Sequence, residues 1–115
     1  MQLSALPPDF FCDVRPARER VIVAMAGELD LAAAPRVGAT VDELLDVGFG
    51  RIVIDLRELR FLDSAGVHTL LSARERAEER GAVLSLVRGP RNVHSVFELT
   101  GVGSVFAFDD APGMA

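Results

Sequence analysis

The sequence predicts an α/β fold with a largely parallel sheet. A chain of 115 residues suits one domain, and 50% hydrophobic with 25% charged residues is the composition of an ordinary globular protein. From residue 20 onward, segments typical of strands alternate with segments typical of helices. This alternation favours parallel strands joined by right-handed crossovers. We therefore expect residues 1–115 to form one domain, with a core from about 10 to 110.

The first elements are a predicted hairpin and a helix. Residues 10–15 (FFCDVR) and 20–26 (RVIVAMA) are rich in β-branched and aromatic residues, and the intervening PARE is a turn signal. Pro35 then stands where the first turn of a helix tolerates proline, and apolar residues follow at helical spacing as far as Gly48. The pattern predicts a helix over residues 33–47.

The second half of the chain continues the alternation. Residues 51–56 (RIVIDL) are apolar on both faces of the pleat, which indicates a central or covered strand. Residues 64–80 have helical periodicity, and residues 82–87 (AVLSLV) read as another strand. A short third helix is expected around 93–97 and a last strand over 102–108.

Composition argues against several functions. The net charge of -5 repels nucleic acid and anionic lipid, so we expect neither as a direct partner. No lysine is present, which excludes a Schiff-base or P-loop lysine. The single cysteine, Cys12, fits a reducing compartment and is expected to pack as a small apolar residue. Without a signal-like N-terminus or a spanning apolar run, we expect a cytoplasmic protein.

The segment FLDSAGVHTLL, residues 61–71, resembles the G-x-S-x-G signature of serine hydrolases. That signature needs glycine two residues before the serine, and Leu62 stands there. We also expect the preceding strand to end near Leu56, which leaves a connection of about six or seven residues before Ser64. His68 follows at i+4, but no acid is evident to orient it. Hydrolysis by Ser64 is therefore a remote alternative, and no catalytic residue is assigned.

Sequence motifs for metals and cofactors are also missing. No Cys/His cluster, phosphate-binding glycine loop or paired-carboxylate motif occurs. His68 and His94 are interpreted as residues on helix surfaces. We expect no metal and no cofactor, and a protein that is not an enzyme.

Ser64 also stands where a modifying enzyme could act on it. Asp63 and Ser64 are both good helix N-cap residues, and capping alone could explain them. A helix N-terminus accommodates an added phosphate, with a gain of about 0.3–2 kcal/mol. Phosphoserine would add negative charge beside Asp63 and near the expected strand ends at Asp30 and Asp55. A partner bound to unmodified Ser64 would then be released.

Four segments in order carry a family resemblance. They are GELD at 27–30, VIDLREL at 53–59, FLDSAGV at 61–67 and VFELTGVGSVFAFDD at 96–110. With them the chain resembles the anti-sigma factor antagonists of the bacterial STAS-domain family. The resemblance implies a mixed sheet of four to five strands, begun by the hairpin, with helices packed mainly on one side.

The resemblance also implies a function in transcription regulation by partner switching, in stress response or sporulation. The unphosphorylated antagonist binds an anti-sigma factor, a serine kinase of GHKL type, and releases the sigma factor. The kinase phosphorylates the antagonist, and a PP2C-type phosphatase restores it. ATP belongs to the kinase, so the antagonist itself holds no cofactor. Family members are often monomers, so we expect a monomer or weak dimer.

By motif position the resemblance makes Ser64 the phosphorylation site, with Gly66 permitting close approach. Ala65 replaces a second serine that many members carry, and His68 could influence partner choice. The full predicted partner-binding set is Asp30, Asp55, Asp63, Ser64, Ala65, Gly66 and His68.

A different role within the same family stays open. The chain could be a STAS subunit of another complex, such as the partner of a lipid-transport ATPase or a stress-signalling scaffold. Neighbouring genes would separate these roles, since a kinase and a sigma factor point to one and transporter genes to the other.

Overall fold

A five-stranded sheet organises the fold. The computed structural model describes residues 9–109. The elements are β1 (Phe10–Pro16), β2 (Val21–Leu29), α1 (Ala34–Val47), β3 (Arg51–Leu62), α2 (Ser64–Glu79), β4 (Val83–Val87), α3 (Arg91–Thr100) and β5 (Phe108–Asp109). The strand order is β1-β2-β3-β4-β5, with β1 antiparallel to β2 and the other neighbours parallel. The predicted hairpin, the alternation and the mixed sheet are confirmed.

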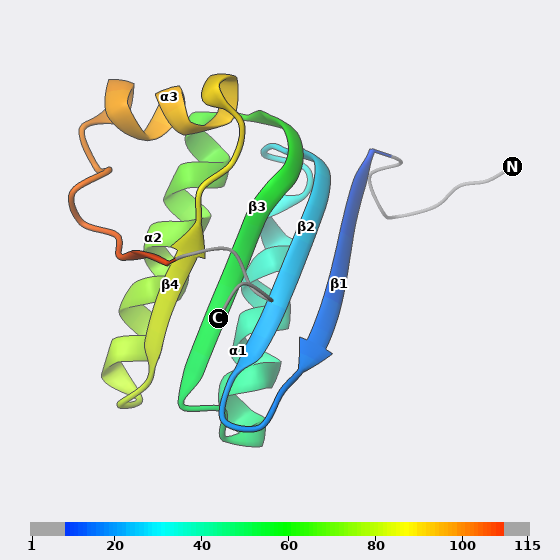
Figure 1. Cartoon of the computed structure of the whole chain (residues 1–115), viewed down its shortest axis with the longest axis vertical. Coiled ribbons are helices and arrows are strands. Elements are labelled where there is room, and N and C mark those ends of the chain that lie inside the picture. Colours follow the sequence, from blue (N-terminus) through cyan, green and yellow to red (C-terminus); the bar gives the residue numbers. More distant parts are fainter. Residues whose placement is uncertain (1–8, 110–115) are drawn as a thin grey trace, which may run out of the picture.

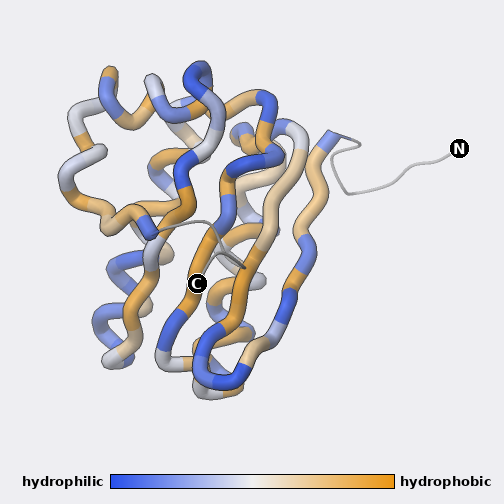
Figure 2. The backbone as a smooth tube through the Cα atoms, viewed as in Figure 1, coloured by the Kyte–Doolittle hydropathy of each residue, from blue (hydrophilic) through white to orange (hydrophobic). Residues whose placement is uncertain are grey.

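The helices lie mainly on one side of the sheet, as expected. Figure 1 shows α1 and α2 behind the strands, while α3 crosses the top of the sheet near the end of β3. Alternate residues of β2 are buried against the helices, because side chains of a strand point to opposite faces in turn. Figure 2 shows hydrophobic segments along the inner strands β2, β3 and β4. The core therefore lies between this face and α1 and α2.

Strand β3 is longer than predicted. Its second half, Arg57–Leu62, carries three charged residues and lacks simple alternation, so the sequence suggested a connection. In the structure it pairs with the end of β2, and two register shifts interrupt the pairing. These shifts let Leu56, Leu59 and Leu62 all reach the core. The prediction that the strand ends near Leu56 is wrong, and a single residue, Asp63, separates β3 from α2.

The C-terminal elements also differ from the prediction. α3 extends over Arg91–Thr100, beyond the predicted 93–97, and the predicted strand over 102–108 is reduced to β5. Phe106 is buried and packs edge-on against Phe97, with ring centroids 5.5 Å apart, instead of extending the sheet. Within residues 9–109, no helix is both long and apolar enough to cross a bilayer.

Candidate functional site

Ser64 is the first residue of α2, directly beyond the end of β3. Asp63 precedes it in extended conformation and is the N-cap, because its Oδ1 accepts a hydrogen bond from the backbone N–H of Gly66 at 2.9 Å. Ser64 is exposed, and its hydroxyl forms no hydrogen bond within residues 9–109. Of the two possible caps, the structure therefore uses Asp63 and leaves the Ser64 hydroxyl available.

Gly66 brings the first turn of α2 against the end of β2. It is buried, and a Cβ at this position would lie 2.6 Å from the carbonyl oxygen of Leu29 and 2.7 Å from a methyl carbon of Leu62. Only glycine avoids these contacts. The close approach expected at Gly66 is thus made within the chain, and Gly66 offers little surface to a partner.

Asp30 lies at the same edge of the sheet as Ser64. Leu29, at the end of β2, pairs with Leu62, and its carbonyl accepts a hydrogen bond from the N–H of Asp63 at 3.3 Å. The Asp30 carboxylate accepts from the N–H of Ala33 at 3.1 Å, which fixes the turn into α1. The predicted proximity of Asp30 to the Ser64 end is confirmed.

An open groove of about 660 Å³ runs between α1 and α2 and begins at Ser64. It is lined by Leu31, Ala34, Pro35, Gly38, Ser64, Ala65, His68, Thr69, Ser72 and Arg76. Thr69 ties the two helices together by donating a hydrogen bond to the carbonyl of Ala34 at 3.2 Å. At the far end, Arg76 pairs with Asp42 at 2.7 Å. The groove is thus apolar near Ser64 and charged a few turns away.

Leu31 is the most exposed large apolar residue among the groove residues that sequence reasoning missed. It follows Asp30 and is 74% exposed, so it takes little part in the core. Together with the lining residues Ala34, Pro35 and Ala65 it forms a contiguous apolar patch, which is a candidate interaction surface. The sequence did contain one indication, because Leu31 precedes α1 and is not part of the helix's apolar stripe. Its position over the groove depends on how α1 and α2 pack, which the sequence does not display.

Asp55 is not part of the Ser64 end, contrary to the prediction. It lies in the middle of β3, opposite Ala24 of β2 and Val87 of β4. The strand continues seven residues beyond it to Leu62, which at about 3.3 Å per residue is roughly 20 Å. The error follows directly from the predicted strand end at Leu56.

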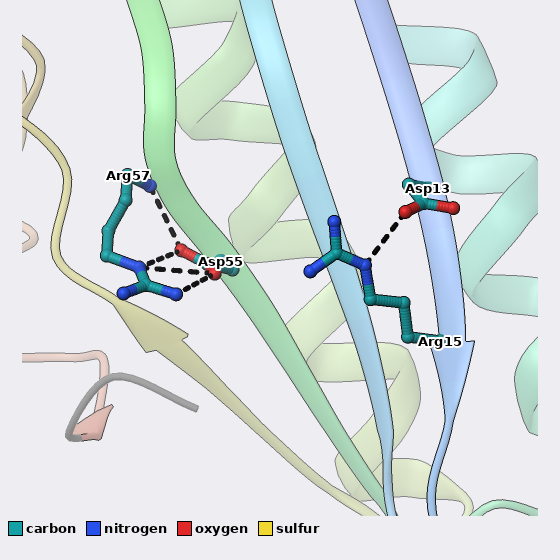
Figure 3. Close-up of polar contacts among 4 residues, drawn as sticks. All are labelled: Asp13, Arg15, Asp55 and Arg57. Carbon is teal, nitrogen blue, oxygen red and sulfur yellow. Dashed lines mark hydrogen bonds and ion pairs between the residues drawn. The ribbon is translucent and has the colours of Figure 1, made fainter. Parts of the chain in front are cut away.

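Asp55 instead forms an ion pair on the sheet face opposite the helices (Figure 3). Its carboxylate accepts from the backbone N–H of Arg57 at 3.1 Å and from the guanidinium at 3.0 and 2.8 Å. Burial alone would raise the pKa of Asp55, but the hydrogen bonds and charge of Arg57, with the charge of Arg15, outweigh it and hold that pKa below its ordinary value. Asp55 is therefore ionised and paired.

The two histidines have different surroundings. His68 is exposed, as predicted, and lines the groove one helical turn after Ser64. His94 is half-buried, because its ring packs edge-on against Phe108 with centroids 5.1 Å apart. The prediction that His94 lies simply on a helix surface is therefore wrong.

The comparison with serine hydrolases also changes. Ser64 follows β3 after one residue, so the predicted connection of six or seven residues, which spoke against a nucleophile elbow, is wrong. Ser64 still does not fit a nucleophile elbow, because buried Leu62 occupies the position that requires glycine. No carboxylate hydrogen-bonds to His68 in the described part of the chain.

Known proteins match this chain in sequence. An anti-sigma-B factor antagonist of Listeria monocytogenes is 27% identical over 96 residues, which cover 83% of both chains. A putative anti-sigma factor antagonist, BtrV of Bordetella bronchiseptica, is 29% identical over 86 residues, or 75% of this chain and 74% of the relative.

Solved structures match as well. The anti-sigma factor antagonist SpoIIAA in its unphosphorylated form has a TM-score of 0.75 and 26% identity over 90% of both chains. The phosphorylated form of SpoIIAA, from Bacillus, has a TM-score of 0.69 and 25% identity over 90% of this chain and 93% of that one. A family model described as "Mlab, STAS domain" matches residues 12–107. With most of the chain matched by that model and the sheet, helices and Ser64 junction in place, the chain belongs to the STAS domain family.

Proposed function

We propose that this protein is an anti-sigma factor antagonist whose binding is switched off by phosphorylation of Ser64. The observation that carries the proposal is the exposed Ser64 hydroxyl at the start of α2, beside a groove and freed from capping by Asp63. The relatives described as anti-sigma factor antagonists support the same role. In the unphosphorylated form, the protein binds an anti-sigma factor at this groove and so releases a sigma factor.

Phosphorylation at Ser64 is compatible with the fold. The side chain is exposed, and the first turn of α2 presents the positive end of the helix dipole to an added phosphate. SpoIIAA supports this expectation, since both its unphosphorylated and its phosphorylated form share this fold. We expect phosphorylation to change the surface and leave the domain folded.

The change at the surface is large enough to act as a switch. Leu31, Ala34, Pro35 and Ala65 make the groove near Ser64 mainly apolar. A phosphoserine would add a charge of about -1.5 to -2 there, and a partner packed against it would have to bury that charge poorly paired. Such burial costs a few kcal/mol, and about 1.4 kcal/mol is tenfold in affinity. We expect phosphorylation of Ser64 to weaken the affinity for the partner on the order of a hundredfold.

The partners follow from this role. The anti-sigma factor is a serine kinase of GHKL type that binds the ATP, and a PP2C-type phosphatase reverses the modification. The antagonist contributes a substrate serine and a docking surface, with no catalytic residue, metal or cofactor of its own. It acts in the cytoplasm on transcription, as a monomer or weak dimer that forms heteromeric complexes.

The test is the affinity for candidate anti-sigma factors encoded beside this gene. We expect Ser64→Ala to bind like wild type and Ser64→Asp to bind about a hundredfold more weakly, because only aspartate brings charge into the contact. Ser104→Asp is the matched control, since Ser104 is exposed and lies outside the groove. Equal affinities for Ser64→Ala and Ser64→Asp would contradict the switch and favour a STAS subunit of another complex.

A further inference from the structure

A second cleft lies where β4 leads into α3. It has a volume of about 390 Å³ and is lined by Arg88, Gly89, Arg91, His94 and Glu98. None of these residues lines the groove at Ser64. A neighbouring cleft shares Arg88, His94 and Glu98 and extends along α3 to Phe108. The proposed function makes no use of this part of the molecule.

Two arginines give the cleft its charge. Seven other arginines of the protein form ion pairs with carboxylates, but within residues 9–109 neither Arg88 nor Arg91 does. The guanidinium carbon of Arg88 lies 5.3 Å from the centroid of the Phe108 ring, a cation–π arrangement that holds the side chain against a lining residue of the neighbouring cleft. In a chain of net charge -5, these two guanidinium groups have donors left for an external acceptor.

His94 lines the same cleft and carries a polar atom without a partner in the described residues. Its Nδ1 is buried and has no hydrogen-bond partner among the described residues. Buried polar atoms nearly always have a partner, and leaving one without costs free energy. The ring is positioned by Phe108 and Phe97, at centroid distances of 5.1 and 5.9 Å. This packing fixes the imidazole that lines the cleft.

The backbone at the cleft supplies further positive potential. α3 begins after Pro90, which has no side-chain group to cap the helix, and its first turn contains no acidic residue. By contrast, α2 is capped by the carboxylate of Asp63. The Pro90 carbonyl accepts hydrogen bonds from the N–H groups of Val93 and His94, so the preceding two N–H groups point out of the helix end. This potential strengthens the attraction that the two arginines provide.

We propose that this cleft binds a phosphate-type anion, either inorganic phosphate or the phosphate of a small phosphomonoester, between Arg88 and Arg91. Planar guanidinium groups match the oxygen geometry of phosphate and can each donate two hydrogen bonds. A volume of about 390 Å³ is in the range of small-molecule sites. Glu98 also lines the cleft, and its carboxylate can accept a hydrogen bond from a hydroxyl group of an ester.

The test is an NMR titration of the whole chain at constant ionic strength, with sodium phosphate in one arm and glycerol phosphate in the other. We expect saturable shifts of the Arg91 and Asn92 amides, with a Kd on the order of 1 mM. Arg88→Gln and Arg91→Gln should each weaken binding about tenfold, since each removes charge-assisted hydrogen bonds. Equal affinity in the two arms identifies phosphate itself as the ligand, and tighter binding of the ester identifies a phosphorylated metabolite.

Two control variants make the test specific. Arg18→Gln removes an exposed arginine that has no ion pair within residues 9–109 and lies in the β1–β2 turn, and it should leave the Kd within about twofold. Ser64→Ala should also leave it unchanged, which separates this site from the proposed switch. The proposal is overturned by the absence of saturable shifts below roughly 20 mM. It is equally overturned if chloride produces the same shifts, or if Arg18→Gln weakens binding as much as the cleft variants do.

Discussion

Asp55 and Asp63 belong to the same β3–α2 segment, yet they serve opposite parts of the molecule. Asp63 stands at the edge of the sheet, where it caps α2 and leaves the adjacent Ser64 exposed. Asp55 is buried in the middle of β3, and Arg57 satisfies its carboxylate on the face away from the helices. Both carboxylates accept hydrogen bonds from within the chain. Asp63 caps the helix next to a serine that can accept a phosphate, whereas Asp55 forms an ion pair that stabilises the sheet.

The motifs VIDLREL and FLDSAGV are almost adjacent in the sequence, yet they have different roles in the structure. In FLDSAGV, the local structure makes a hydroxyl available next to an apolar groove. In VIDLREL, the carboxylate of Asp55 is buried and paired with Arg57, so it is not exposed to partners. Substitutions in the first motif should therefore alter binding and packing at the Ser64 edge. Substitutions in the second should alter stability alone.

The largest expected effect is at Gly66, where an added methyl group would disturb the packing between β2 and α2 without changing any charge. Gly66→Ala places a Cβ 2.6 Å from the Leu29 carbonyl oxygen, so backbone has to move. We expect the free energy of unfolding to fall by about 2–3 kcal/mol, measured by urea denaturation. Gly38→Ala is the control, since its nearest contact is a flexible Arg76 nitrogen at 3.5 Å. A Gly66→Ala protein as stable as Gly38→Ala would refute the tight junction.

The Asp55 ion pair gives the next largest effect. Asp55→Asn should lower the free energy of unfolding at neutral pH by about 1–2 kcal/mol, because it removes charge-assisted hydrogen bonds at a buried site. Asp13→Asn is the control on the same face (Figure 3), and it should change little because that pair with Arg15 is exposed. Binding of the anti-sigma factor should be unaffected by either variant.

The same ion pair predicts a pH dependence. The pKa of Asp55 is lowered in the folded protein, so its contribution is present above the unfolded pKa of about 3.9 and is lost as pH falls through the folded pKa. The stability difference between wild type and Asp55→Asn should therefore shrink in acid. Denaturation curves measured at neutral and acidic pH check this, and a difference that grows in acid would contradict the account.

A substitution at Leu31 should affect binding and not stability. Leu31→Ala should weaken binding of the anti-sigma factor about tenfold, as expected when a partner buries an exposed apolar side chain. Stability should hardly change, because the side chain is 74% exposed. Leu99→Ala is the matched control, with 85% exposure on α3. Equal effects of the two variants on calorimetric affinity would remove Leu31 from the docking surface.

The smallest effects concern the cap. Asp63→Ala should cost about 1 kcal/mol of unfolding free energy, whereas Ser64→Ala should cost less than about 0.5 kcal/mol, because only Asp63 bonds to the Gly66 N–H. Thermal or urea unfolding of the two variants distinguishes them. The reverse order would mean that Ser64 is the cap and that its hydroxyl is not free.

Local patterns predicted α1 and α2 well, but they predicted the length of α3 and the end of β3 poorly. Pro35 with Gly48 bounded α1, and apolar periodicity bounded α2, so both helices lie within a residue of their predicted ranges. The extension of β3 was missed because two register shifts break the alternation on which strand prediction depends. Asp55 was misplaced as a direct result. The strand predicted over 102–108 was wrong because Phe106 packs on Phe97, a tertiary contact that local sequence patterns cannot predict.

The candidate site was predicted in part. The Asp63–Ser64 junction follows from capping preferences and from family motifs, and Asp30 lies near it because neighbouring parallel strands end at the same edge. The groove was not foreseen, because it depends on the packing of α1 against α2. The choice of Asp63 over Ser64 as cap also needed coordinates, since both residue types are good caps.

Phosphosite mapping tests the central claim most directly. The protein would be incubated with the neighbouring candidate kinases and Mg-ATP, and its intact mass and phosphopeptides measured beside Ser64→Ala and Thr69→Ala. Thr69 lines the same groove, but its hydroxyl donates to the Ala34 carbonyl. The account predicts one phosphate, on Ser64, which is lost in Ser64→Ala and kept in Thr69→Ala. A phosphate that persists in Ser64→Ala, or wild type that no candidate kinase modifies, would contradict it.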